Sequence, residues 1–289
     1  MFVVTGATGN VGGACARALL KAGRKVRVVL RDAAKAATWE ALGAEIALAN
    51  IDDVPALARA FAGAEGVFLM MPPNFAPDRY YTFARDTATS LAEAIRTCEP
   101  EKVVALSSIG GGHDSGLGLI TQVHILEQAL ARLALPTAIL RPGWFMENSV
   151  WDIAPARDAG EMPSFLQPLD KGYPMIATAD IGAVAAKTLG ETWTGRRVIE
   201  IEGPKRYSQV EIATLLGAVL GRDVAAKPIP RSDWEARFKA EGSADPAPRI
   251  EMVDGFNSGW IAFEPGQHEH VVGTTTYKTV LEQLAAQAA

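Results

Sequence analysis

Short apolar runs alternate with longer amphipathic segments along the first half of the chain. The runs have the length of β-strands and most are rich in Val, Ile or Leu, whereas the segments between them carry apolar residues at helical spacing. The predicted strands are 2–5, 25–30, 45–49, 66–70, 102–107 and 137–140. The predicted helices are 12–22, 34–42, 54–61, 79–98 and 119–133.

This alternation also predicts how the strands pair. Strands that are separated by helices pair in parallel, because a parallel crossover needs a connecting element. The strands are apolar almost throughout, which indicates a sheet that is buried on both faces. We therefore predict an α/β protein built on a doubly wound, Rossmann-type parallel sheet.

The alternation stops after Pro142. Residues 144–174 are rich in Trp, Pro and Met, which predicts irregular or short helical structure. Asp180 and Ser208 are the expected N-caps of two later helices. The later predicted elements are strands at 173–177 and 197–202 and helices at 181–191, 209–220, 231–241 and 275–288.

The change of pattern predicts two parts of the molecule. A Rossmann domain is expected at 1–143 and 173–202. A smaller C-terminal α+β lobe, which would bind the substrate, is expected at 144–172 and 203–289.

Three glycines at the spacing GxxGxxG follow the first predicted strand. The first glycine permits a tight turn, the second lets backbone N–H groups approach a pyrophosphate, and the third lets the next helix lie close to the sheet. The N-terminus of that helix adds oriented N–H donors for the phosphates. A glycine-rich turn without a ligand is the weaker alternative. The predicted dinucleotide contacts in this motif are Gly6, Thr8, Gly9, Asn10, Val11 and Gly12.

The residue after the second strand decides the choice of cofactor. An acidic residue at this place bonds the ribose 2′-OH of NAD, but here the residue is Arg31, which favours the 2′-phosphate of NADP. Lys35 lies one helical turn further on and is expected to assist. Asp32 either caps the following helix or contacts a ribose. The alternative for Arg31 is an ordinary solvated charge.

Two further segments follow the third and fourth predicted strands. Asp53 is the expected N-cap of the helix at 54–61, since Pro55 is tolerated in a first helical turn. Met71 and Pro72 end the fourth strand at the carboxyl edge, where open α/β sheets bind ligands. They are expected near the nicotinamide ribose, and the alternative is that they only end the strand.

Composition excludes several other classes of protein. The chain has 289 residues, 48% of them hydrophobic, which suffices for a large core. Its net charge is −5 and no basic run stands out, so we expect no direct nucleic-acid binding. No apolar stretch approaches the ~20 residues that span a bilayer, and we expect no cleavable signal before the glycine motif. We expect a cytoplasmic protein.

No metal site is predicted. Cys15 and Cys98 lie in unrelated segments without a CxxC motif, and Cys15 is expected to pack in the core. His268 and His270 would share one face of a strand. No third ligand accompanies them, so an exposed or substrate-side loop is expected there.

The chain resembles the short-chain dehydrogenase/reductase superfamily and, more closely, its atypical NmrA-like branch. That branch includes NAD(P)H:quinone oxidoreductases, azoreductase-like proteins and NADP-sensing regulators. The run 141–148 (Arg-Pro-Gly-Trp-Phe-Met-Glu-Asn) is the most specific match. The other matching segments are 5–12, Arg31, Asp52-Asp53, Ser107-Ser108, His124-x-x-Glu127, 179–181, and 202–204 followed by Ser208 and Glu211.

The resemblance implies a catalytic set that this chain lacks in part. Typical members use Ser to orient the substrate carbonyl, Tyr to transfer a proton, and Lys to hold the nicotinamide ribose. Ser107 or Ser108 fits the serine, but Ile120 stands at the tyrosine and His124 at the lysine. Because isoleucine cannot transfer a proton, we expect an activated acceptor such as a quinone, which needs less help from a protein acid.

His124 is the expected ribose anchor or proton donor, since imidazole holds or releases a proton near neutral pH. A capped or core histidine is the alternative. Glu127 either orients His124 or contacts the ribose, or is a solvated helix charge. His113 follows three glycines in a loop beside the site, where a flexible turn is the plainer reading than a substrate contact.

Aromatic residues after the fourth and sixth strands are expected to form the acceptor pocket. Their loops fall at the carboxyl edge of the sheet, where a flat substrate can stack. The predicted pocket residues are Phe75, Tyr80, Tyr81, Trp144 and Trp151. Tyr80 and Tyr81 are also candidates to replace the missing proton donor.

Together these features predict an NADPH-dependent oxidoreductase that transfers hydride to a quinone-like or other activated small molecule. The alternative is a non-catalytic NADP-binding redox sensor that acts through a protein partner, which the missing tyrosine favours. A specialised reductase of a biosynthetic intermediate is a third possibility. The oligomeric state stays open.

Overall fold

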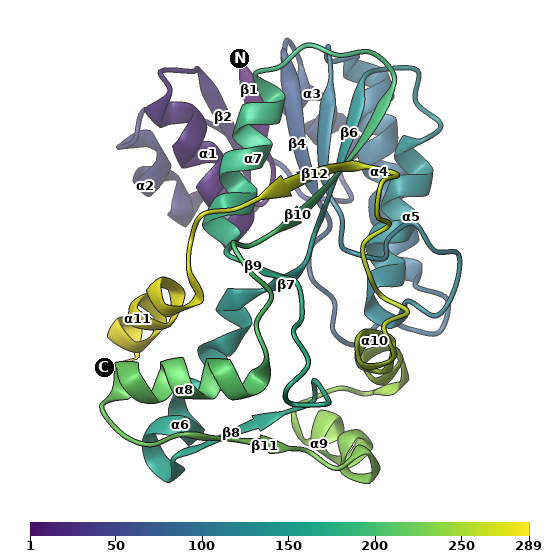
Figure 1. Ribbon diagram of the computed structural model, residues 1–289. Coiled ribbons are helices and arrows are strands. Elements are labelled where there is room, and N and C mark those ends of the chain that lie inside the picture. Colours follow the sequence, from purple (N-terminus) through teal and green to yellow (C-terminus); the bar gives the residue numbers. More distant parts are fainter. Residues whose placement is uncertain (289) are drawn as a thin grey trace.

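The computed structural model describes residues 1–288, and its main sheet confirms the predicted fold class (Figure 1). Eight strands pair in parallel in the order β12-β10-β6-β5-β4-β1-β2-β3. Their bounds are β1 Phe2–Val4, β2 Val26–Leu30, β3 Glu45–Leu48, β4 Gly66–Met70, β5 Val103–Leu106, β6 Thr137–Pro142, β10 Arg196–Glu202 and β12 Glu269–Val272. The strand order reverses between β1 and β4, and ligands of such sheets bind outside the carboxyl ends at this point.

Helices cover both faces of the main sheet. On one face, α1 (Asn10–Lys21) and α7 (Thr178–Leu189) pack against each other around one hydrophobic core. On the other face, α3 (Val54–Phe61), α4 (Thr82–Cys98) and α5 (Thr121–Leu130) enclose a second core. The strands between these layers are buried on both sides, which explains their nearly continuous apolar sequence.

A third hydrophobic core lies mainly in the segments after β6, below the carboxyl ends of the strands in Figure 1, and also includes Ile109, Leu117 and Ile120. Two short parallel pairs belong to this part, β7 with β9 and β8 with β11. The bounds of its elements are β7 Trp144–Phe145, β8 Glu161–Ser164, β9 Met175–Ile176, β11 Ala225–Pro228, α6 Ile153–Ala159, α8 Gln209–Leu220, α9 Trp234–Ala240, α10 Ala247–Ser258 and α11 Tyr277–Gln287. None of the helices in residues 1–288 has the length and apolar character that a bilayer crossing needs.

Of the N-caps predicted at Asp53, Asp180 and Ser208, two are confirmed and one is wrong. Ser208 caps α8 in a reciprocal capping box with Glu211, and Asp53 caps α3 by accepting from Ala56 N at 2.9 Å. Asp180 does not cap α7. The helix begins at Thr178, whose backbone N–H donates to the Glu147 carboxylate at 2.9 Å. A carboxylate from a distant segment thus takes the capping role.

Asp180 instead lies in the first turn of α7 and binds another segment. Its carboxylate accepts from the backbone N–H of Thr275 at 2.8 Å and from the Thr275 hydroxyl at 2.7 Å. These bonds attach the chain between β12 and α11 to the start of α7. The prediction of an N-cap at Asp180 is therefore wrong because its partner is tertiary rather than local.

Several predicted elements are shorter than expected or lie elsewhere. The strand expected at 173–177 is reduced to β9, which pairs with β7 outside the main sheet. Residues of β12, expected in the lobe, add an edge strand beside β10. The helix expected at 34–42 divides into a 3₁₀ turn, η1 (Ala33–Lys35), and α2 (Ala36–Glu40). The helix expected at 119–133 likewise begins with η2 (Gly118–Ile120). The division into two domains stays a prediction.

The contact between α1 and α7 depends on small residues. Gly182 of α7 faces Ala14 and Cys15 of α1, and a Cβ atom on Gly182 would lie 2.4 Å from the Ala14 Cβ. It would also lie 2.7 Å from the Cys15 backbone nitrogen. Cys15 is fully buried in the core, as predicted. Because α1 follows the glycine motif, this contact helps to place that motif on the sheet.

We expect Gly182→Ala to destabilise the fold by about 1–3 kcal/mol, the usual cost of overpacking, although Ala favours a helix by about 1 kcal/mol. Chemical denaturation followed by circular dichroism measures the change. Ala183→Leu on the exposed side of α7 is the matched control and should stay within about 0.5 kcal/mol of the wild type. Equal stability of Gly182→Ala and the wild type would contradict the close packing.

Candidate functional site

The glycine motif forms a tight turn between β1 and α1, at the carboxyl end of β1 (Figure 1). Gly6 adopts a positive φ of 64°, a conformation that side chains disfavour. A Cβ atom on Gly12 would lie 2.4 Å from the Gly6 carbonyl oxygen, so only glycine lets the helix approach the turn this closely. The Thr5 hydroxyl donates to Phe68 O at 3.1 Å and accepts from Met70 N at 3.2 Å, which ties the turn to β4.

The start of α1 is open on the side where a pyrophosphate would bind. Its N-cap is Gly9, no side chain caps the helix, and no acidic residue lies in its first turn. Thr8, Gly9 and Asn10 are exposed. The first-turn N–H groups of a helix lack intrahelical partners and attract anions. The turn therefore fits the phosphates of a dinucleotide, and the individual contacts stay predictions.

Two exposed cations follow β2. Within residues 1–288, neither Arg31 nor Lys35 forms an ion pair or a side-chain hydrogen bond. The Asp32 carboxylate caps η1 by accepting from Ala34 N at 2.9 Å, which confirms the capping alternative for this residue. Arg31 and Lys35 thus keep their donors available for an anion such as a 2′-phosphate.

The predicted contacts after β4 differ from each other in accessibility. The side chain of Met71 is buried in the core around α3 and α4, whereas Pro72 is half-buried. Only the backbone of Met71 is therefore free to border a cofactor. Met70, one residue earlier, covers Gly6, because a Cβ atom on Gly6 would lie 2.1 Å from the Met70 Sδ atom.

A buried network of hydrogen bonds lies behind the carboxyl end of β5. The Glu127 carboxylate of α5 is only 2% exposed and accepts from the Ser107 hydroxyl at 2.5 Å. It also accepts from Arg141 Nη2 at 2.8 Å and Nε at 3.0 Å, and from Arg196 Nη2 at 2.8 Å. The solvated helix charge, one of the alternatives for Glu127, is therefore wrong. The carboxylate makes no direct hydrogen bond to His124 in the described residues, and a contact with the ribose stays a prediction.

The network separates the roles of the two candidate serines. The Ser107 hydroxyl is buried and committed to Glu127. Ser108 is half-buried, and within residues 1–288 its hydroxyl has no hydrogen-bond partner. Of the two, Ser108 has the hydroxyl that is free to meet a substrate.

His124 is attached to the glycine-rich loop after β5. Its Nδ1–H donates to the Gly111 carbonyl at 2.9 Å, since a carbonyl can only accept. This bond leaves Nε2 as the free ring nitrogen, and the ring is half-buried. Gly111 itself lies on the buried network, because a Cβ atom there would be 2.7 Å from Ser107 Oγ and 2.8 Å from Glu127 Oε1.

The residue that stands in place of the missing tyrosine packs in a hydrophobic core. Ile120 is buried in the core of the C-terminal part. The hydroxyl of Tyr81 reaches this segment from the β4–α4 loop and donates to Gly118 O at 3.0 Å. Burial raises the pKa of Tyr81, so its phenol is protonated at neutral pH.

The five predicted pocket aromatics do not stack on one another in the described residues. Phe75, Tyr80 and Trp151 are 64%, 60% and 82% exposed. Trp144 is half-buried, with its ring edge against Phe256 at a centroid distance of 5.1 Å. These residues lie around the carboxyl edge of the sheet rather than in one cluster.

One aromatic pair beside the site was not predicted. Trp260, which follows α10, stacks on His113 with ring centroids 4.3 Å apart. The Trp260 indole N–H also donates to Ser115 O at 3.1 Å. The glycine-rich loop is therefore held by a residue that lies 145 positions away in the chain, and no local signal marks Trp260 for this role.

The two C-terminal histidines pair with carboxylates. His268 Nε2 lies 3.0 Å from Glu264, and His270 Nε2 lies 3.0 Å from Glu202. Residues 1–288 contain no group of three or more His, Cys, Asp or Glu that is arranged to hold a metal ion. His270 thus joins β12 to β10, whereas His268 meets the main sheet through Arg141, whose Nη1 lies 3.3 Å from His268 Nε2.

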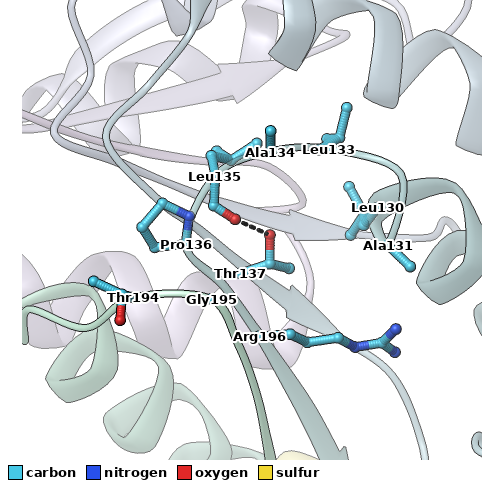
Figure 2. Close-up of a pocket in the computed structure, with 10 residues that line it drawn as sticks. All are labelled: Leu130, Ala131, Leu133, Ala134, Leu135, Pro136, Thr137, Thr194, Gly195 and Arg196. Carbon is cyan, nitrogen blue, oxygen red and sulfur yellow. Dashed lines mark hydrogen bonds between the residues drawn. The ribbon is translucent and has the colours of Figure 1, made fainter.

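A groove of about 380 Å³ lies at the opposite edge of the sheet, near the amino ends of β6 and β10 (Figure 2). Its lining includes Leu130, Leu135 and Arg196. The glycine turn follows the carboxyl end of β1, so this groove is not part of the candidate cofactor site.

Comparisons with known proteins agree with this geometry. The NAD(P)H azoreductase of Xenophilus azovorans is 29% identical over 225 residues, which cover 78% of this chain and 75% of that protein. Quinone oxidoreductase 2 of Escherichia coli K12 is 27% identical over 251 residues, covering 85% and 83%. The crystal structure of the Escherichia coli quinone oxidoreductase QOR2 complexed with NADPH matches with a TM-score of 0.80 at 23% identity, covering 100% of both chains. A model of the NmrA-like family matches residues 1–242, and the chain therefore belongs to the NmrA-like family.

Proposed function

We propose that this protein is an NADPH-dependent oxidoreductase that reduces a quinone-like or other activated small molecule. The observation that carries the proposal is the open start of α1 beside two unpaired cations, Arg31 and Lys35. The names of two relatives, an NAD(P)H azoreductase and a quinone oxidoreductase, support the same class of reaction. We also propose a cytoplasmic location, as the composition led us to expect.

Different residues of the chain bind different parts of the cofactor. The first-turn N–H groups of α1 hold the pyrophosphate, and Arg31 and Lys35 hold the 2′-phosphate. His124 presents Nε2 to the nicotinamide ribose while Nδ1–H stays on Gly111. When bound, NADPH supplies the hydride.

Few side chains on the acceptor side of the site can donate a proton. The Ser108 hydroxyl orients an acceptor oxygen by hydrogen bonding, and the half-buried aromatic Trp144 lies at the same edge of the sheet. Ile120 cannot transfer a proton, and the Tyr81 phenol is bonded to a backbone carbonyl. An acceptor that is stable after reduction as a phenolate suits this surrounding, because it needs no protein acid at the moment of hydride transfer.

Ile120 also favours the second candidate function, a redox sensor that binds NADP without turnover. The two functions differ in one measurable property. A sensor distinguishes oxidised from reduced cofactor and passes the difference to a protein partner, whereas an oxidoreductase consumes NADPH when an acceptor is present.

We expect the purified protein to oxidise NADPH in the presence of small quinones such as menadione. The loss of absorbance at 340 nm measures the rate, and cofactor binding is measured separately by calorimetry. Turnover should exceed the rate in buffer. Tight NADPH binding without turnover of any quinone tested would reject the oxidoreductase function and favour the sensor function.

We expect Arg31→Asp to weaken NADPH binding by about 10- to 100-fold, the range of one lost charge-assisted hydrogen bond. NADH binding should change much less, because NADH has no 2′-phosphate. Lys25→Asp, at the amino end of the same strand, is the matched control and is also exposed. Equal losses for NADPH and NADH would reject the 2′-phosphate role.

The two serines should respond differently to replacement by alanine. Ser108→Ala is expected to lower kcat about tenfold at an unchanged melting temperature, the effect of losing one hydrogen bond to the reacting group. Ser107→Ala should lower the melting temperature, since it removes a buried partner of Glu127. Steady-state kinetics and thermal melts of both variants distinguish these roles. A lower kcat for Ser107→Ala with a lower melting temperature for Ser108→Ala would show that Ser107 contacts the substrate.

A further inference from the structure

A third cation, Arg17, packs on the helix that follows Arg31 and Lys35. Arg17 is an exposed residue of α1, two turns after the start of the helix. Its side chain folds back along the helix toward the glycine turn. Its Nη2 and Nη1 atoms lie 3.2 Å and 3.3 Å from the position that a Cβ atom on Gly13 would occupy. The same position is 2.7 Å from the carbonyl oxygen of Ala7, so the guanidinium adjoins the turn itself.

Trp39 connects Arg17 to the segment that carries the other two cations. The Arg17 guanidinium carbon lies over the Trp39 ring, 5.7 Å from its centroid. Trp39 belongs to α2 and is only 4% exposed, so it offers a fixed surface. Lys35 is the N-cap of the same helix, four residues earlier, and residues at this spacing are neighbours on a helix surface. Arg31 lies directly after β2, four residues before Lys35.

The three cations have no counter-ion of their own. Within residues 1–288, no carboxylate pairs with Arg17, Arg31 or Lys35. The nearest acid in sequence, Asp32, is used to cap η1. No carboxylate of the described residues offsets the positive charge of these three cations, and together they favour a multivalent anion.

We propose that Arg17 binds the 2′-phosphate of NADPH together with Arg31 and Lys35, and that it is a second determinant of the preference for NADPH over NADH. This proposal rests on the proposed cofactor. Arg17 reaches the phosphate from the α1 side, whereas Arg31 and Lys35 reach it from the β2 side. Trp39 keeps the guanidinium in place before the cofactor arrives, which lowers the ordering cost of binding.

Arg17→Met tests the charge, because methionine keeps an apolar side chain over Trp39. Adenosine 2′,5′-bisphosphate and 5′-AMP are the probes, since they differ only in the 2′-phosphate. We expect Arg17→Met to weaken binding of the bisphosphate about tenfold and to leave 5′-AMP within about twofold of the wild type. Arg17→Lys should recover part of the loss. Calorimetry gives the affinities.

Lys21→Met is the matched control, because Lys21 is an exposed cation one turn further along the same helix. It should change neither affinity. An equal loss for both probes with Arg17→Met would place Arg17 at another part of the nucleotide, and no loss would show that it only covers Trp39. Either result overturns the proposal.

The wild type separates this proposal from the proposed cofactor. If the wild type binds the bisphosphate no more tightly than 5′-AMP, the choice of NADPH is itself wrong. If the wild type prefers the bisphosphate and Arg17→Met behaves like the wild type, only the role of Arg17 fails. A thermal melt of each variant shows whether it is folded.

Discussion

The hydrogen bonds of the buried Glu127 carboxylate are the interaction on which the proposed acceptor side of the site depends. It accepts from Ser107, Arg141 and Arg196, and so connects α5 with β5, β6 and β10. Burial by itself lowers the pKa of Arg141, but its hydrogen bond to Glu127 and the charge of that residue raise the pKa above its ordinary value. A charge buried this deeply is tolerated only when it is paired, and removing one partner of such a pair costs about 3–5 kcal/mol.

The glycine-rich loop rests directly on this network. Gly111 lies so close to Ser107 and Glu127 that a side chain would collide with both. The same residue accepts the hydrogen bond from His124. The network therefore places the loop, and the loop places His124, although Glu127 and His124 do not touch each other. The structural role of Glu127 is thus to support the site from behind.

The two ends of the candidate site are built in different ways. The cofactor end is formed by segments that are continuous in the chain, namely the glycine turn with α1 and the residues that follow β2. The proposed acceptor end is assembled from β5, α5 and the residues after α10, where Trp260 stacks on His113. This difference suits a fold that carries different functions, because residues from separate segments can change without altering the glycine turn.

What the sequence determined by itself is local. The alternation of apolar runs and amphipathic segments predicted the parallel sheet, and the glycine spacing predicted the turn before α1, because both depend on neighbouring residues. Tertiary structure alone decided the partners of Glu127, the role of Asp180 and the position of Trp260. Each of these side chains meets residues far away in the chain. The sequence of α5 by itself allows a solvated charge at Glu127. The folded protein buries that charge, because distant strands supply its partners.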